Sequence, residues 1–356
     1  MAYGKGNLGG KSKLKFWETD LDFTHVLLEN NLGGYSVNFN YAYKNVKVVQ
    51  NPSSTYIKIY YKNILMKEID ILVSLHYEYG HIIITEEENI YIRTGTYFYT
   101  FLKSENYNIR HDFYSPATYP ICNVNFEFND NLYFISQKTI DGSYRMVLFK
   151  FPIPENKIIS QNPVELNLQI GSTSLISFFI SNGFGYYCDN TKINNTIIYK
   201  VDLINMVKTS ININISSFSV VNYLGYYNNK HYLYAKNDSD NRLYYLMYND
   251  AGGSIVENNI INLDNEKFKN TLFKPNLYLT ALNKSVQVNE RIVAMNFGTN
   301  NSYNNALGYF DFETKSIVKY ISESNITLPL IGTLNKVVGY NTNSYKTGVF
   351  QQFYIE

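Results

Sequence analysis

The residues of this sequence that could take part in catalysis or metal binding are five histidines, two cysteines and a set of carboxylates between apolar runs. Nucleophilic catalysis needs a Ser, Cys or Thr beside a base, usually His. The histidines and cysteines are His25, His76, His81, His111, His231, Cys122 and Cys188. No nucleophile elbow of the form Gly-x-Ser-x-Gly is present, and the cysteines lack metal-site spacing. We therefore predict no catalytic residue, and interpret the cysteines as buried and reduced, with a single Cys122–Cys188 bridge as the alternative if the fold brings them together.

Loop carboxylates could instead serve glycoside hydrolysis, which needs two facing carboxyl groups, or calcium binding, which needs several oxygens in one short loop. The candidates Asp141, Asp189, Asp238 and Asp240 stand in Asn/Ser/Asp/Gly clusters, where such residues are ordinary turn formers. The segment Asn237-Asp-Ser-Asp-Asn241 offers oxygens but does not match the EF-hand pattern. We predict neither a metal nor a cofactor.

The elements that carry these residues are predicted to be strands. The chain contains 35 Tyr and 22 Phe but one Trp, and 45% of its residues are hydrophobic against 17% charged. Tyr, Phe, Ile and Val favour a pleated, half-buried surface. No segment shows sustained helical periodicity. A folded, strand-rich protein follows, and disorder is disfavoured.

The charge balance argues against nucleic acid as a partner, because the formal net charge is only +1. The basic cluster Lys5, Lys11, Lys13 and Lys15 lies in a Gly- and Lys-rich stretch at residues 1–15. We interpret this stretch as an extended arm, either a solvated tail or a docking arm for an acidic partner surface. No apolar run has the length of a secretory signal or a membrane span, so we expect a protein made in the cytoplasm without membrane insertion.

Short apolar runs recur along the rest of the chain. In the clearest unit we predict a strand at 131–136, a polar loop at 137–143, a second strand at 144–151 and an outward run at 157–168. Equivalent strands are predicted to start near residues 35, 81, 131, 184, 231, 291 and 336. This spacing of about 45 to 60 residues is the period of propeller blades. Another apolar run precedes each unit, which makes four strands per repeat.

The segment Tyr309-Phe-Asp-Phe-Glu-Thr-Lys-Ser-Ile-Val318 resembles the strand–turn–strand hairpin of YVTN-like propeller repeats, and Tyr199-Lys-Val-Asp-Leu203 is a weaker match. The resemblance implies an all-β β-propeller over residues 16–356. We expect seven four-stranded blades, with an N-terminal strand at Leu14-Lys-Phe-Trp17 completing the last one. The alternative is six blades plus a small N-terminal β module.

Asn, Ser, Asp and Tyr in the predicted blade-tip loops suit adaptable contacts on a rigid scaffold. The candidate ligand-binding residues are Tyr186, Tyr187, Tyr226, Tyr227, Asp238, Asp240 and Tyr303. Tyrosine offers a large amphipathic surface that can stack on a sugar or pack on a protein. The competing interpretation is that these tyrosines pack between blades.

The leading hypothesis is a non-enzymatic component of a phage tail, baseplate or tailocin of a low-GC bacterium, since residues with AT-rich codons are abundant. Its partners would be other tail or baseplate subunits, reached through the N-terminal arm, and a bacterial surface glycan or protein. It would be located on the particle in multiple copies. The alternatives are a glycan-processing enzyme on the same scaffold and a cytosolic protein-interaction propeller.

Overall fold

The computed structural model describes most strands of the chain and the turns that join many of them. The described residues are 23–29, 39–50, 54–72, 81–85, 87–93, 97–114, 125–152, 164–166, 177–189, 196–264, 277–278, 285–299, 302–322, 330–333, 336–339 and 349–355. Within them the chain is all-β apart from one 3-10 turn, η1 (Lys103–Glu105). The chain divides into two compact units, here called unit 1 (1–25, 175–342 and 353–356) and unit 2 (26–174 and 343–352).

Unit 2 contains three antiparallel sheets of four strands, each in sequence order. The first sheet is β2 (Phe39–Tyr43), β3 (Val46–Gln50), β4 (Tyr56–Tyr61) and β5 (Ile64–Asp70). The second is β6 (His81–Ile84), β7 (Ile90–Arg93), β8 (Tyr97–Phe101) and β9 (Ile109–Tyr114). The third is β10 (Asn125–Phe128), β11 (Asn131–Ile140), β12 (Ser143–Pro152) and β13 (Val164–Glu165).

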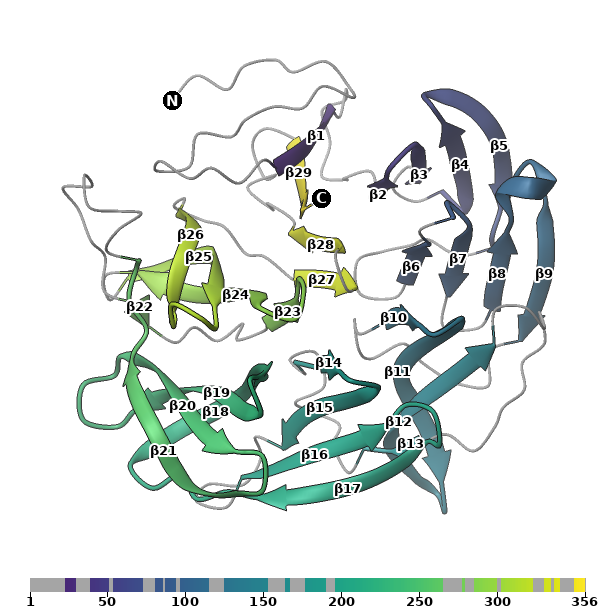
Figure 1. Cartoon of the computed structure of the whole chain (residues 1–356). Helices are drawn as coiled ribbons and strands as arrows, with labels where there is room; N and C mark the ends of the chain where they lie inside the picture. Colours follow the sequence, from purple (N-terminus) through teal and green to yellow (C-terminus); the bar gives the residue numbers. More distant parts are fainter. Residues whose placement is uncertain are drawn as a thin grey trace. The chain divides into compact units, whose positions relative to one another are not determined.

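Unit 1 repeats the same plan (Figure 1). Its first sheet is β14 (Phe179–Ser181), β15 (Phe184–Asp189), β16 (Ile197–Asp202) and β17 (Val207–Asn212). The next is β18 (Phe218–Tyr227), β19 (Lys230–Asn237), β20 (Leu243–Asn249) and β21 (Gly252–Ile260). A five-stranded sheet follows with β22 (Leu277–Tyr278), β23 (Ser285–Gln287), β24 (Ile292–Thr299), β25 (Ser302–Asp311) and β26 (Ser316–Ser322), and then β27 (Leu330–Thr333) pairs with β28 (Lys336–Gly339).

The predicted fold class is confirmed: the chain is an all-β protein of the β-propeller class, built from successive antiparallel sheets of four strands. Five of the predicted repeat starts coincide with second strands, since β11, β15, β19, β24 and β28 begin at 131, 184, 230, 292 and 336. The two earliest starts were wrong by one strand. The positions near 35 and 81 correspond to the first strands β2 and β6, whereas the second strands begin at Val46 and Ile90. The number of blades stays a prediction.

The N-terminal part of the chain pairs with its C-terminal part. Strand β1 (Phe23–Glu29) forms a two-stranded sheet with β29 (Val349–Ile355). The expected partner, Leu14–Trp17, lies outside the described residues, as does the whole arm at 1–15. A strand from the beginning of the chain therefore does meet the last strand, but it is a later segment than the one we expected.

The predicted polar loop at 137–143 is wrong. Strands β11 and β12 continue through it as one regular ladder, from Asn131 paired with Pro152 to Ile140 paired with Ser143. Only Asp141 and Gly142 form the turn, with φ values of 50° and 74°. Both lie in the left-handed region that two-residue hairpin turns require, and Asp-Gly is a favoured pair for it. The polar residues at 137–139 indicated a loop, but the tight turn uses only two residues, and those are Asp141 and Gly142.

Three consecutive sheets of unit 1 meet at Gly225 on β18. A Cβ atom there would lie 2.3 Å from the ring of Phe312, which follows β25, and 2.8 Å from the ring of Phe179 on β14. These two rings pack edge to face with centroids 5.8 Å apart. The missing side chain therefore makes the space in which aromatic rings of the two flanking sheets touch.

We predict that Gly225→Ala destabilises the fold by about 1–3 kcal/mol, because the added methyl group must displace two buried rings. Chemical denaturation followed by tyrosine fluorescence measures the change. Ser254→Ala, at an exposed position on β21, is the matched control and should change stability by less than about 0.5 kcal/mol. Equal stability of the Gly225→Ala variant and the native chain would contradict the close packing.

Candidate functional site

The richest cluster of aromatic and titratable side chains lies in unit 1, between the sheet β14–β17 and the sheet β18–β21. The rings of Tyr186 (β15) and Tyr226 (β18) stack with centroids 4.9 Å apart. His231 (β19) lies edge-on to Tyr186 at 5.5 Å. The ring of Tyr223 (β18) also stacks on the ring of Tyr186, with centroids 6.1 Å apart. Strict alternation along β18 would place Tyr223 and Tyr226, three residues apart, on opposite faces of the sheet. The irregularity between Tyr223 and Gly225 places both on the same face.

His231 is fully buried, and both of its ring nitrogens have partners. Nε2 lies 3.1 Å from the backbone oxygen of Asp250, and Nδ1 lies 2.9 Å from the hydroxyl of Tyr223. A carbonyl oxygen can only accept, so Nε2 carries the proton, and Nδ1 accepts from Tyr223. Burial lowers the pKa of His231, and burial raises the pKa of Tyr223 well above its ordinary value. The histidine is thus a neutral ring held inside the fold by its two hydrogen bonds.

Tyr226 connects this cluster to the surface. Its hydroxyl donates to the exposed carboxylate of Asp250 at 2.9 Å. Burial is the main cause that raises the pKa of Tyr226 to about 12, and the bond to Asp250 adds to it. Lys200 (β16) also lies near this cluster, with its Nζ 4.1 Å from the ring centroid of Phe184 and 5.9 Å from that of Tyr186. The sequence placed Tyr186 and Tyr226 in one candidate surface, and the structure brings them together, but as a packed pair.

The other predicted tyrosines are separated from this pair. Tyr187 is fully buried and stacks between Phe178 at 5.9 Å and Tyr199 at 5.0 Å. Tyr227 is half-buried and stacks on Phe312 at 5.9 Å. For Tyr186 and Tyr187, burial favours the packing interpretation over ligand contact, because neither ring offers accessible surface. Tyr303 lies on β25.

The loop that joins β19 to β20 holds the two predicted aspartates, and its conformation is fixed by its own side chains. Asn237 Oδ1 accepts a bond from the Ser239 amide at 2.9 Å, and Asp240 Oδ1 accepts one from the Arg242 amide at 2.9 Å. The hydroxyl of Tyr244 donates to the second carboxylate oxygen of Asp240 at 2.9 Å. These are Asx turns, the turn-forming use of Asn and Asp. They leave Asp238 exposed at the tip of the loop.

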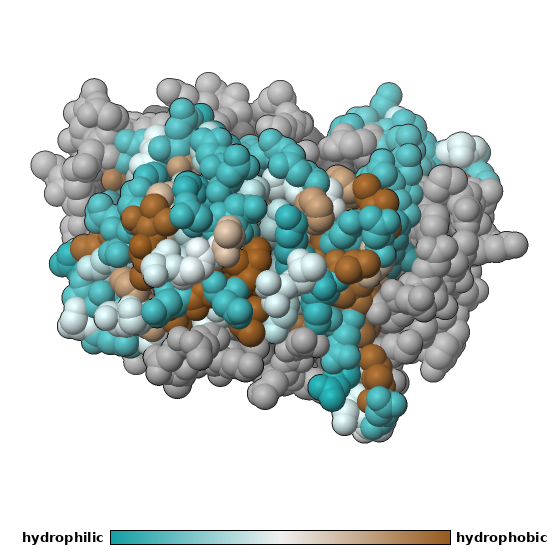
Figure 2. Space-filling view, turned by 60° about the horizontal axis from the view of Figure 1, so that its bottom comes forward, coloured by the Kyte–Doolittle hydropathy of each residue, from teal (hydrophilic) through white to brown (hydrophobic). Residues whose placement is uncertain are grey.

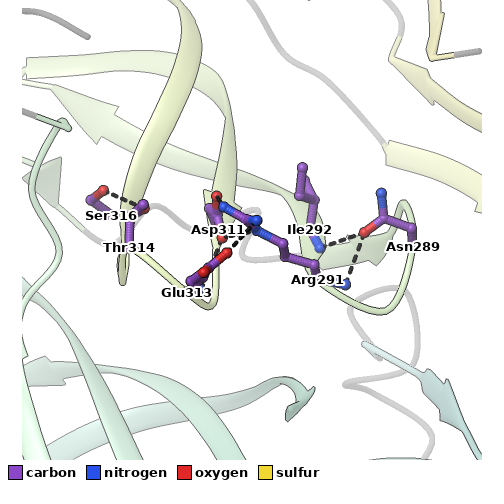
Figure 3. A network of polar contacts seen from close by, with 7 residues as sticks. All are labelled: Asn289, Arg291, Ile292, Asp311, Glu313, Thr314 and Ser316. Carbon is purple, nitrogen blue, oxygen red and sulfur yellow. Dashed lines mark hydrogen bonds and ion pairs between the residues drawn. The ribbon is translucent and has the colours of Figure 1, made fainter. Parts of the chain in front are cut away.

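A second polar network ties the turns of the sheet that contains β24 to β26 (Figure 3). Arg291 donates to both carboxylate oxygens of Asp311, from Nε at 2.8 Å and from Nη2 at 2.6 Å, and it also contacts Glu313. Burial by itself would raise the pKa of Asp311, but the Arg291 bonds and backbone amides hold it below the ordinary value. Asp311 belongs to the segment that resembles a YVTN-like hairpin, and its Oδ1 accepts the Glu313 amide at 2.9 Å.

The weaker match shows the same geometry. Asp202 ends β16, and its Oδ1 accepts the amides of Ile204 at 2.8 Å and Asn205 at 2.9 Å. In both hairpins an aspartate at the end of the third strand therefore organises the turn to the next strand. The resemblance seen in the sequence thus has a local structural cause.

Several predictions concern residues outside this description. Lys5, Lys11, Lys13, Lys15 and Cys122 lie outside the described residues. Cys188 is a buried thiol, as expected. Among the described residues, no three His, Cys, Asp or Glu side chains are grouped as metal ligands would be, and no helix is long and apolar enough to cross a bilayer.

Sequence reasoning missed the roles of Asp250, Tyr223 and Tyr244. Asp250 stands in an Asn-Asp turn that resembles any other in the sequence, and its link to His231 spans the hairpin of β19 and β20, which joins residues 19 apart in the chain. The role of Tyr244 could have been inferred from its position four residues after Asp240. That spacing lets a tyrosine near the start of β20 reach back to an aspartate in the preceding turn. No such local signal exists for Tyr223.

No family model matches this chain, and no curated protein matches it. Solved structures that resemble it include Hsv2 of Kluyveromyces lactis, with 10% identity, 90% of this chain and 98% of that chain covered, and a TM-score of 0.44. The Dos1 propeller has 10% identity, 87% and 75% coverage and a TM-score of 0.45. The WD40 domain of SCAP from fission yeast has 10% identity, 87% and 82% coverage and a TM-score of 0.40. At these scores the assignment of the fold rests on the sheets of this chain.

We predict that His231 makes stability depend on pH. Its pKa is lowered in the folded chain from an unfolded value of 6.5, so below about pH 6.5 the unfolded chain binds a proton that the folded chain does not. The contribution of His231 to the free energy of unfolding should therefore be fully present above pH 6.5 and decrease as the pH falls below that value. Urea titrations between pH 5 and 8 measure this dependence.

His231→Gln should lower stability by about 1–3 kcal/mol at pH 7.5 and flatten the fall below pH 6.5. Tyr223→Phe keeps the histidine and removes only its partner hydroxyl, so this variant should keep the fall. Identical pH profiles for His231→Gln and the native chain would show that another group titrates.

Proposed function

We propose that this chain is a non-enzymatic binding scaffold, which contacts its ligand through turns held rigid by the sheets. The observation that carries the proposal is the loop between β19 and β20. Three side-chain bonds preform it, and Asp238 projects from it into solvent. A preformed loop loses little conformational entropy on binding, so its hydrogen bonds translate efficiently into affinity.

The chemistry of this loop suits a ligand rich in hydrogen-bond donors. Asp238 offers a carboxylate, which is a stronger acceptor than a neutral oxygen. Asn241, three residues later in the same loop, is also exposed, has a left-handed φ of 60°, and adds a side-chain amide that both donates and accepts. Sugar hydroxyls, or the basic side chains of a protein, would match this set. Charged groups elsewhere, such as Asp311 with Arg291, are instead used to hold turns together.

The finer proposal is that this scaffold is an attachment component of a phage tail, baseplate or tailocin that binds a bacterial surface polymer. Its support is the composition typical of a low-GC genome and the basic stretch at residues 1–15, which suits docking to an acidic neighbour in an assembly. A cytosolic protein-interaction propeller is the second candidate. Exposed apolar side chains favour a protein contact of that kind, with Ile204 in the turn before β17 at 60% exposure and Val207 on β17 at 55%. Figure 2 shows such hydrophobic areas on one face, set among hydrophilic residues.

We predict that Asp238→Asn weakens binding to cell-wall polysaccharide purified from a clostridial strain by about tenfold or more, because it removes a charged acceptor. Biolayer interferometry measures the dissociation constant. The matched control is Asp130→Asn, another exposed aspartate at a hairpin turn, which should leave binding unchanged. No binding by the native chain would count against a surface polymer as ligand, and equal losses in both variants would count against this loop.

The particle role predicts that the full chain sediments with phage-like particles from a lysed culture of the producing cell. Deleting residues 1–15 should release it into the soluble fraction while its circular dichroism and melting temperature stay those of the native chain. Electron microscopy of the pellet identifies the particles. Retained incorporation after the deletion would contradict the docking role of the arm.

A further inference from the structure

Exposed apolar side chains are concentrated on one hairpin of unit 2. Eight large hydrophobic residues are exposed among the described residues, and four of them, Tyr56, Ile64, Leu65 and Leu72, belong to strands β4 and β5 or directly follow them. Ile64 is 67% exposed, and Leu65 is 47% exposed. Single exposed aliphatic residues are ordinary, but adjacent ones at a hairpin tip indicate a contact surface.

This hairpin is the outer edge of its sheet. Strand β5 stands last in the order β2-β3-β4-β5, so one of its edges has no partner strand in that sheet (Figure 1). The turn before it is formed by Lys62 and Asn63, with φ values of 48° and 66°, which is the tight hairpin geometry. An outer strand of this kind is a common site of contact between chains.

The charges along β5 indicate which partner fits. Lys62 precedes the apolar residues Ile64 and Leu65, and Glu68 and Asp70 follow them; these five residues are exposed, whereas Lys67 between them is half-buried. The exposed residues of the segment 62–70 thus run from a basic end through an apolar centre to an acidic end. A partner of one charge sign would be repelled by one of the two ends. A second copy of the same strand, placed antiparallel, would be attracted at both.

We propose that two copies of this chain associate through their β4–β5 hairpins about a two-fold axis near Leu65. The axis brings Leu65 of one copy against Leu65 of the other, and Ile64 of each copy against Met66 of the other. It also places Lys62 of each copy beside Glu68 of the other. Such a contact is self-complementary, as the symmetric interfaces of homodimers are. It adds a partner to the chain and is independent of the ligand loop between β19 and β20.

The contact is made by side chains rather than by one continuous sheet. The pairing of β4 with β5 shifts by one residue between Ile59 and Tyr60, which leaves Met66 as an extra residue on β5. A bulge of this kind interrupts regular edge-to-edge hydrogen bonding. One hairpin per copy also buries less area than a standard stable interface. We therefore expect a reversible dimer that forms at micromolar or higher concentration and weakens as salt screens the ion pairs.

Sedimentation velocity of the full chain from about 1 to 300 μM tests the proposal. The native chain should shift from monomer to dimer, and Ile64→Lys should stay monomeric, because it places two like charges near the axis. Val256→Lys, at another exposed aliphatic residue, on β21, is the matched control and should dimerise like the native chain. A monomeric native chain over the whole range, or dimerisation of Ile64→Lys, would overturn the proposal.

Exchanging the charges of Lys62 and Glu68 tests the proposed ion pairs directly. Lys62→Glu and Glu68→Lys should each raise the dimer dissociation constant about threefold to tenfold, since every substitution occurs twice in a symmetric contact. The double variant Lys62→Glu/Glu68→Lys should restore dimerisation. Glu68 also lies 3.8 Å from Lys58 in its own sheet, so the melting temperature of each variant separates loss of folding from loss of contact. Failure of the double variant to recover while it remains folded would reject the proposed pairing.

Discussion

A sheet of four strands cannot cover its own apolar faces, and this constraint governs the whole structure. In each unit, successive sheets cover one another mainly with aromatic rings. Tyr186 of one sheet stacks on Tyr226 of the next at 4.9 Å, and Phe179 meets Phe312 across Gly225. Aromatic rings suit this task, because each buries a large area while using few rotatable bonds. The abundance of Tyr and Phe is thus explained by packing between sheets.

Where sheets meet, buried polar side chains take over the bonding that a neighbouring strand would give. The amide of Gln287 (β23) accepts from the backbone N–H of Ile180 (β14) and donates to its carbonyl, both at 2.7 Å. In unit 2, Glu88 accepts from the backbone and side chain of Asn45 in the preceding sheet and from Lys103. Burial would raise the pKa of Glu88, yet these bonds hold it below the ordinary value. Each such group would be costly without its partners, so it specifies how the sheets of a unit align.

Much of the fold could be predicted because its signals are local. An apolar run with turn residues at its end identifies a strand, and the runs beginning at 131, 184 and 336 were placed to the residue. The turn lengths could not be predicted in the same way. Residues 137–139 are polar, yet they pair in the ladder between β11 and β12, because hydrogen bonding between strands uses backbone groups and does not require apolar side chains. The early repeats were displaced for a similar reason, since all strands of a sheet have similar composition.

The candidate site shows a sharper limit. Sequence position identified Asp238 and Asp240 as turn residues, and the bond from the Arg242 amide to Asp240 is of the kind that residue type indicates. It could not separate tyrosines that pack from tyrosines that face solvent, because alternation along β18 is broken by an irregularity between Tyr223 and Gly225. One shifted residue reverses which side chains point inward along the rest of a strand. Exposure of an aromatic residue in such a protein is therefore a property of strand register, whereas exposure of a turn residue follows from chain reversal itself. Contact surfaces are consequently best sought at turns and outer edges, where burial between sheets does not compete for the side chain.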